Sequence, residues 1–307
     1  MALFTYLQQT QRLIGDIQQR QIAPNDIIFY INTARRHVAE LTQSIRVLTP
    51  ISGSITSITT LTGGTNYTSP SVTVTPPDFP GGTATNPGGL QATAVAHLSG
   101  NSIASITMVI NGSGYFQPQV TITDPTGTGA TASAVVSPIN TVNQNQEVYQ
   151  FSNMPLGSAP GVASILAIKS VAIIFDNYRY PLPQYSFTIY QAYVRRYPFQ
   201  YTYMPTVSCQ YGQGINGSLY LYPLPNNTYQ LECDCFALPI DLVDDTTFEA
   251  LPLPWTDSVS YYAAYLAFLE KQDRNAAREM LDLFDKMLLR QSVSARPGRS
   301  SNPLGRW

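Results

Sequence analysis

A repeat with a period of 48 residues constrains this chain more than any other feature of its sequence. Moving the sequence by that distance places residues 55–59 on residues 103–107. The same shift aligns Gly64 with Gly112, Tyr67 with Tyr115, Pro70 with Pro118, Val72 with Val120, Val74 with Ile122 and Pro77 with Pro125. Residues 92–96 then recur as residues 130–134 after a shorter loop. Such self-similarity predicts two copies of one small structural unit.

Each copy is expected to be an all-β unit. Small or β-branched apolar residues alternate with Ser and Thr in 71–75 and 120–123, which is the period of a half-buried strand, and Gly and Pro residues bound these segments. Disorder is the alternative, because the chain between Arg46 and Lys169 contains no Lys or Arg and is rich in Gly, Thr, Ser and Pro. The alternation and the repeat favour strands. Two copies are too few for a long solenoid, so we expect them to pair into one compact module.

Helices are predicted on both sides of the β-rich part of the chain. Residues 2–20 carry an apolar stripe, and a second helix is expected to begin at Pro24, with Asp26 in its first turn. The stripe of the first helix is Leu3, Leu7, Ile14 and Ile17, and that of the second is Ile27, Ile31, Ala34, Val38 and Leu41. Arg35 and Arg36 are predicted on the other face, either solvated or paired with a neighbour.

The chain is predicted to be helical again from Trp255 to about Gln291. Val259, Tyr262, Leu266 and Leu269 form the expected buried stripe of the first of two helices. Asp273 is a suitable N-cap for the second helix. That helix has two apolar stripes, which predict burial on more than one side: Ala276, Met280, Leu283 and Met287, then Ala277, Leu281, Phe284 and Leu288.

The region between the repeat and these helices is expected to be rich in strands. Residues 164–176 predict a buried strand pair that ends in a turn, and 185–197 predict a short helix. A hairpin is expected from 218–222 and 228–236, with Cys233 and Cys235 on its buried face. The predicted fold class is therefore α+β: a helical bundle built from the N- and C-terminal helices, an antiparallel β-domain and an inserted all-β repeat domain.

Composition favours an assembly subunit. Charged residues make up 12% of the chain, against about 25% in ordinary soluble domains. The chain has 20 Tyr, and 14 Arg against 3 Lys. Tyr and Arg are the residue types that protein interfaces favour, whereas Lys is depleted there. A compositional bias of the source organism is the alternative. The net charge of −2 gives no indication of nucleic-acid recognition.

No catalytic or metal-binding pattern is present in the sequence, so we expect neither an enzyme nor a cofactor. Three Cys (Cys209, Cys233, Cys235) and two His (His37, His97) form no recognised ligand spacing. The acidic residues Asp241, Asp244, Asp245 and Glu249 do not follow the calcium-loop pattern and are predicted to form a solvated loop. Residues 1–20 lack the continuous apolar core of a secretory signal, and no segment reaches membrane-spanning length.

The last segment, 292–307, is expected to act in binding. Pro and Gly residues prevent a helix there, and it contains three Arg and no acidic residue. Trp307 is a common kind of binding anchor. A disordered end with incidental arginines is the alternative interpretation.

Four segments resemble the head-to-tail adaptors of short-tailed phages, the podovirus tail tubular protein A family. They are the helix at 27–36 (IIFYINTARR), the strand pair at 219–231 (LYLYPLPNNTYQL), residues 250–255 (ALPLPW) and the helix at 261–268 (YYAAYLAF). The resemblance covers roughly residues 1–50 and 145–291. Residues 51–140 depart from the minimal adaptor and resemble the Gly-Gly-x-x-Tyr β-repeats that phage structural proteins carry as additions.

The resemblance implies a specific assembly. Such adaptors form dodecameric rings around a DNA channel, with the helical bundle toward the portal and the β-domain toward the tail nozzle. The expected partners are further copies of the chain, the portal protein, the nozzle protein, the tail fibre as a further candidate, and genomic DNA through non-specific contact, with no membrane. The resemblance places the chain in the neck of the virion after assembly in the host cytoplasm. By the same likeness the portal-binding residues are Arg296, Arg299, Leu304, Arg306 and Trp307.

The predicted parts of the chain follow this plan. They are N-terminal bundle helices (1–50), an inserted β-repeat domain (51–142), a β-rich tail-facing domain (143–250), C-terminal bundle helices (251–291) and an extended portal-docking tail (292–307). The rival hypothesis is a receptor- or carbohydrate-binding virion protein, which predicts exposed aromatic residues on the repeat module. A tail-associated glycan hydrolase would need a carboxylate pair, for which the repeats offer only Asp78 and Asp124.

Overall fold

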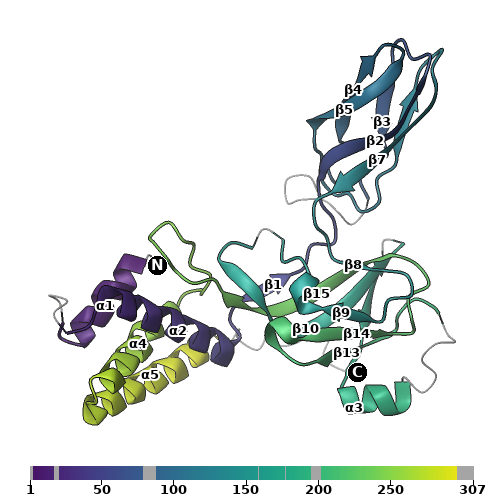
Figure 1. Ribbon diagram of the computed structural model, residues 1–307. Helices are drawn as coiled ribbons and strands as arrows, with labels where there is room; N and C mark the ends of the chain where they lie inside the picture. The colour runs from purple at the N-terminus through teal and green to yellow at the C-terminus, as the bar shows by residue number, and fades with distance from the viewer. Residues whose placement is uncertain are drawn as a thin grey trace. The chain divides into compact units, whose positions relative to one another are not determined.

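The computed structural model describes residues 3–16, 21–78, 88–157, 159–176, 178–194 and 202–295 (Figure 1). The fold is mixed α+β with a sheet-rich body, which confirms the predicted α+β class. The chain divides into two compact units. One contains residues 1–47, 158–167 and 235–307, and the other contains residues 48–157 and 168–234. By residue number, two long strands, β10 (Val162–Phe175) and β15 (Tyr229–Pro239), contribute to both.

Four helices pack together in the first unit: α1 (Leu3–Leu13), α2 (Pro24–Thr42), α4 (Thr256–Glu270) and α5 (Arg274–Ala295) (Figure 1). Helix α4 contacts the other three. Its buried face consists of Val259, Ala263, Ala264 and Ala267, all fully buried, with Ser258 and Ser260 beside them. Small side chains there let neighbouring backbones approach closely. The predicted stripe is wrong at Leu269, which is exposed one residue before the helix ends.

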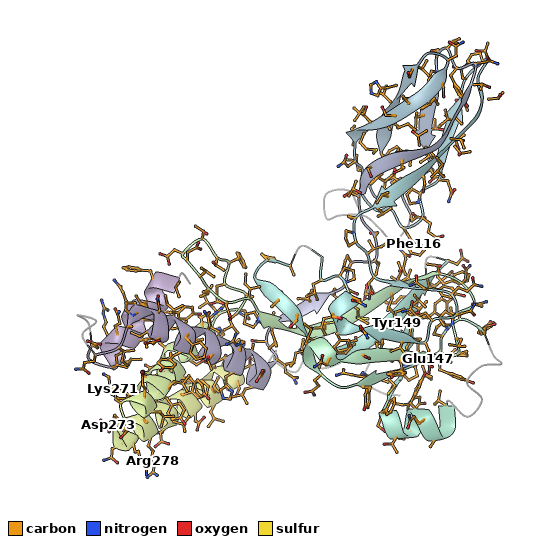
Figure 2. All side chains as sticks on the ribbon, in the orientation of Figure 1. Phe116, Glu147, Tyr149, Lys271, Asp273 and Arg278 are labelled. Atoms are coloured by element: carbon orange, nitrogen blue, oxygen red, sulfur yellow. The ribbon has the colours of Figure 1, made fainter. Side chains whose placement is uncertain are left out.

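Helix boundaries follow most of the predicted signals. The stripe of α2 is buried from Ile27 to Val38, but Leu41 is exposed because the helix ends one residue later, at Thr42. Helix α1 is shorter than predicted and ends at Leu13. Helix α5 begins directly after Asp273, whose carboxylate accepts the N–H of Ala276 at 3.1 Å (Figure 2). It continues four residues beyond the predicted end, and its stripe 276/280/283/287 is only half-buried.

Outside the repeat region, the strands form two sheets. One has the order β12 (Gln184–Tyr185), β13 (Val207–Tyr211), β14 (Ser218–Tyr222), β9 (Val148–Gln150). The other has the order β1 (Arg46–Leu48), β15, β10, β11 (Tyr178–Leu182), with β8 (Thr141–Val142) also paired to β15. Short helical turns lie at Phe151–Asn153, Phe187–Ile189, Tyr190–Val194 and Gly214–Asn216.

This arrangement corrects two predictions. Strands β14 and β15 are present with the predicted bounds to within a few residues, but they lie in different sheets and do not form a hairpin. Residues 164–176 belong to one long strand, β10, rather than to a pair. Its turn at Asp176 is as predicted, and β11 follows it as the antiparallel partner. Alternation identifies a strand, but a strand's partner depends on the path of the chain between them.

Six strands form the repeat region: β2 (Ile55–Thr65), β3 (Ser71–Val74), β4 (Thr93–Ser99), β5 (Ser102–Ile110), β6 (Val120–Thr123) and β7 (Thr128–Val136). They make a four-stranded sheet in the order β4-β5-β2-β7 and a two-stranded sheet, β3-β6. Ile58 pairs with Ile106, and Thr73 pairs with Thr121. Each pair joins residues 48 positions apart, so β2 pairs with its equivalent β5, and β3 with its equivalent β6. The equivalent strands β4 and β7 lie at opposite edges of the four-stranded sheet.

The tyrosine of each copy performs the same task. The hydroxyl of Tyr67 accepts the N–H of Ala130 at 3.1 Å, and that of Tyr115 accepts the N–H of Ala92 at 2.8 Å. Both rings are buried in one core with Ile55, Ile58, Ile103 and Ile106. Each tyrosine therefore joins the glycine turn of its own copy to the small-residue strand segment of the other copy.

Candidate functional site

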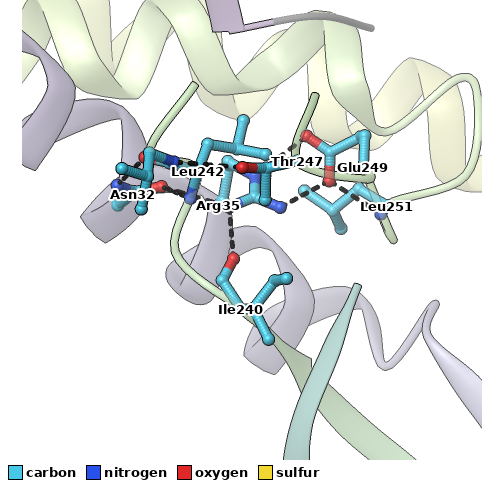
Figure 3. A network of polar contacts seen from close by, with 8 residues as sticks. Asn32, Arg35, Ile240, Leu242, Thr247, Glu249 and Leu251 are labelled. Atoms are coloured by element: carbon cyan, nitrogen blue, oxygen red, sulfur yellow. Dashed lines mark hydrogen bonds and ion pairs between the residues drawn. The ribbon is translucent and has the colours of Figure 1, made fainter. Parts of the chain in front are cut away.

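A buried polar network holds a loop, 240–255, against α2 (Figure 3). At its centre, the Arg35 guanidinium donates to both carboxylate oxygens of Glu249, from Nε to Oε2 at 2.9 Å and from Nη2 to Oε1 at 2.8 Å. The side chains are 1% and 4% exposed. Nη1 of Arg35 also donates to the carbonyl of Ile240 at 2.7 Å and to Oδ1 of Asn32 at 3.1 Å. A guanidinium matches a carboxylate in two parallel hydrogen bonds, which fixes both position and angle.

Asn32 extends the network by one turn of α2. Its Nδ2 donates to the carbonyl of Leu242 at 3.0 Å, and its Oδ1 accepts the N–H of Leu242 at 2.8 Å. The side-chain amide thus pairs with the loop backbone as a neighbouring strand would. Oε1 of Glu249 also accepts the N–H of Leu251 at 2.9 Å. One face of α2 therefore holds the loop at Ile240, Leu242 and Glu249.

The exposed acidic residues shape the loop between these points. Oδ1 of Asp244 accepts hydrogen bonds from the backbone and the hydroxyl of both Thr246 and Thr247. These hydrogen bonds hold the pKa of Asp244 below its usual range. Asp245 accepts the N–H of Phe4 at 2.7 Å, which ties the start of α1 to the loop. Asp241 forms a solvent-exposed ion pair with Arg36 at 2.8 Å.

This fixed loop presents apolar side chains to solvent. Val243 is 77% exposed, Phe248 57% and Leu253 75%, and Phe4 at the adjoining end of α1 is also exposed. A loop that is held by buried hydrogen bonds loses little further conformational entropy when a partner binds to it. Exposed apolar groups on such a rigid support are typical of protein–protein contacts. The arrangement suits binding to a macromolecular partner.

Parts of this site are predictable from the sequence, but its centre is not. Arg35 is paired, one of the two predicted alternatives, but the predicted solvated face is wrong because the side chain is buried. The acidic residues were predicted as one solvated group, which is wrong for Glu249. Arg35 and Glu249 are 214 positions apart, so no local pattern could join them. The predicted portal-binding residues Arg296, Arg299, Leu304, Arg306 and Trp307 lie outside the described residues.

Other candidate groups have structural roles. Cys233 and Cys235 are buried on one face of β15, as predicted, and Cys209 is also buried. His37 stacks on Tyr262 with ring centroids 4.4 Å apart, and Nε2 of His97 lies 2.8 Å from the Thr107 hydroxyl. Across the described parts of the chain, no three His, Cys, Asp or Glu residues gather in a way that could hold a metal ion. No helix in those parts is long and apolar enough to cross a membrane.

The chain is poor in charged residues, has an α+β fold and uses a buried polar network to position a loop with exposed apolar side chains. The chain matches the SU10 adaptor protein family over residues 1–306, and it belongs to that family. It is thus a phage adaptor protein, a structural component of the virion that contacts other virion proteins such as those of the portal and tail. A comparison with curated proteins finds no match.

Proposed function

We propose that this adaptor forms a closed ring that joins the portal to the tail nozzle and surrounds the DNA channel in the neck of the virion. The membership of almost the whole chain in a phage adaptor family carries this proposal. A ring is expected because contacts between different faces of identical subunits either close or grow into filaments. Twelve subunits, as in the tail tubular protein A type of podovirus adaptor, would match the resemblance noted in the sequence.

In this assignment the four helices of the first unit form a bundle that faces the portal, and the sheets of the second unit face the nozzle. The chain acts by assembly in the host cytoplasm and catalyses no reaction. Its DNA contacts are non-specific, as the net charge of −2 suggests. Residues 296–307 dock into the portal through their Arg side chains, Leu304 and Trp307, and repeated copies compensate by avidity for the entropy lost in ordering them.

The six repeat strands form an inserted module in this proposal. The N–H of Ser137 donates to the carbonyl of Ser54 at 2.8 Å, and Ile55 pairs with Val136. The chain therefore enters and leaves the repeat strands at neighbouring positions, which is what an insertion requires. The rival receptor-binding function predicts exposed aromatic residues here. Among the described residues of the module, Tyr67 and Tyr115 are buried and Phe116 is half-buried, so no observation favours that function.

The test is mass photometry and negative-stain imaging of the purified chain mixed with its portal. We expect rings that stack on the portal with the full chain and fail to stack when residues 296–307 are removed, a deletion that leaves α5 whole. A triple variant, Arg296→Ser, Arg299→Ser and Arg306→Ser, should weaken stacking. The matched control changes three exposed Arg on α5: Arg274→Ser, Arg278→Ser and Arg290→Ser. A monodisperse monomer or trimer that ignores the portal would overturn the proposal.

A further inference from the structure

The rigid loop 240–255 and the segment that follows α5 are chemically complementary. The chain from Asp241 to Asp257 contains five acidic residues and no Lys, Arg or His. Residues 296–307 contain three Arg and no acidic side chain, together with Leu304 and Trp307. Glu249 is buried against Arg35, but the other four carboxylates are exposed, as are Val243, Phe248 and Leu253. Each segment thus has the charge sign and the apolar groups that the other would bind.

The loop and the end of α5 lie in one compact unit. Met287 of α5 lines a hollow of about 440 Å³ together with Asp257, Ser260 and Tyr261 of α4. Helix α4 begins at Thr256, directly after the loop. Helix α5 continues from Met287 to Ala295, a distance of about 12 Å at 1.5 Å per residue. The twelve residues beyond Ala295 can span up to about 40 Å when extended, so they can reach the loop of their own chain.

We propose that residues 296–307 bind over the loop 240–255 of their own chain before the adaptor meets the portal. The apolar side chains of the loop and of Phe4 are then covered in the free subunit, which limits premature association between copies. The inference rests on the proposed function in one respect, since the portal is the partner that draws the segment away. The same twelve residues thus have two successive binding sites.

The contact is expected to be weak, and its weakness is what makes it reversible. Exposed ion pairs contribute little each, and salt screens them over about 8 Å at physiological ionic strength. A short flexible tether gives an effective concentration in the millimolar range, so a weak contact within one chain is still populated. A portal site that offers repeated copies can compete with it, whereas a tight contact within the chain would block assembly.

Hydrogen–deuterium exchange of the full chain and of a chain ending at Ala295 tests the proposal. In the full chain, we expect the amides of residues 243–248 and 4–8 to exchange about two- to tenfold more slowly, as a weak tethered contact allows. Amides of α2 should exchange equally in both. Raising the salt concentration to about 0.5 M should shrink the difference, because the Arg–carboxylate attraction is screened.

A pair of matched variants of the full chain makes the test specific. Phe248→Ser removes an exposed apolar group from the loop and should abolish the protection of residues 4–8. Phe29→Ser removes a similarly exposed Phe, 62% against 57%, from α2 of the same unit and should leave that protection unchanged. Equal exchange in the full and shortened chains overturns the proposal. Protection that rises with protein concentration also overturns it, because the segment would then be binding a second copy.

The outcome is separable from that of the proposed function. Suppose that exchange shows no contact but the shortened chain fails to stack on the portal. The proposed contact within the chain is then wrong, and the proposed function stands. If the full chain never stacks on the portal, the proposed function fails whatever the exchange result. If both hold, adding portal should return the amides of residues 243–248 to the faster exchange of the shortened chain.

Discussion

At the scale of single residues, Arg35 and Glu249 decide where a long loop lies. Both are almost fully buried, and a buried charge without its partner is strongly destabilising because its desolvation is no longer compensated. Arg36, the next residue on α2, forms an exposed pair with Asp241 at the same 2.8 Å distance. The two adjacent arginines have equally short ion pairs, but Arg35 is buried and also donates to Ile240 and Asn32, whereas Arg36 is exposed. They therefore make a useful comparison.

Arg35→Met is expected to destabilise the first unit by about 3–5 kcal/mol, because it leaves the Glu249 carboxylate buried and unpaired. Arg36→Met should cost at most about 1 kcal/mol, since its pair is solvated. Urea unfolding followed by helical circular dichroism measures both. The double variant Arg35→Met/Glu249→Met should recover part of the loss. Equal losses for the two single variants would contradict the assignment of the buried pair.

Asp124 carries a prediction about pH. Partial desolvation raises its pKa, but hydrogen bonds from the N–H groups of Thr126, Ser69, Gly127 and Thr68 outweigh this and hold the pKa well below its ordinary value. A carboxylate whose pKa is depressed on folding contributes stability above its unfolded pKa, and this contribution is lost as pH falls through the folded value.

Acidification below about pH 4 should therefore weaken the repeat strands in the natural chain. In Asp124→Asn the thermal midpoint should be lower at neutral pH and should fall less steeply on acidification. Thermal melts of both chains across this pH range measure the midpoints. Hydrogen exchange of residues 68–69 and 126–127 then shows whether the change is local to Asp124. Parallel pH profiles for the two chains would show that Asp124 has no such role.

At the scale of elements, the glycine turns of the repeat explain why the period is so visible in the sequence. Gly64 has a φ of +64°, and a Cβ there would lie 2.5 Å from the carbonyl oxygen of Thr128 and 2.6 Å from the Tyr67 ring. Gly112, its equivalent, would meet Tyr115 in the same way. A glycine and a tyrosine three residues apart are thus required together in each copy.

Gly64→Ala is expected to cost roughly 2 kcal/mol more than Gly100→Ala, because overpacking of this kind costs about 1–3 kcal/mol. Gly100 is a matched control, since its φ is +63° but no atom lies within 4 Å of the added Cβ. An alanine in the left-handed backbone conformation is strained in both variants. The difference in their unfolding free energies therefore reports only the close contacts of the Cβ added at position 64. The effect is measured by hydrogen exchange of the Ala130 amide, which donates a hydrogen bond to the Tyr67 hydroxyl. Equal protection in the two variants would contradict the crowding.

Elements were predictable from the sequence where local signals determine them. Pro24 and Asp273 mark helix starts, and the alternation in 71–74 and 120–123 marks strands, because capping and pleating act over a few residues. The partners of β14 and β15 were not predictable from alternation, and neither was the alanine face of α4. In both cases the decisive contact is with a distant element. The pairing of Arg35 with Glu249 in the candidate site was not predictable for the same reason, because the two residues are 214 positions apart.

At the scale of the whole molecule, the proposed insertion predicts that the rest of the chain folds without the repeat strands. Ser54 and Ser137 are hydrogen-bonded neighbours at the entry and exit of the module. Replacing residues 55–136 with a few Gly and Ser residues should therefore leave the helical circular dichroism and the portal stacking of the chain unchanged. Loss of soluble protein or of stacking would show that the module is integral. A chain with the same residues inserted after Gly100 controls for the linker.

The pairing of Ile58 with Ile106 has a consequence for the history of the chain. Each half of the module supplies the strands that complete the other half, so neither half has a closed core alone. A single half would therefore need a second copy of itself, in a symmetric pair, to complete its sheet. Relatives in this family are then expected to carry both halves or neither, because the loss of one would leave its twin unable to fold.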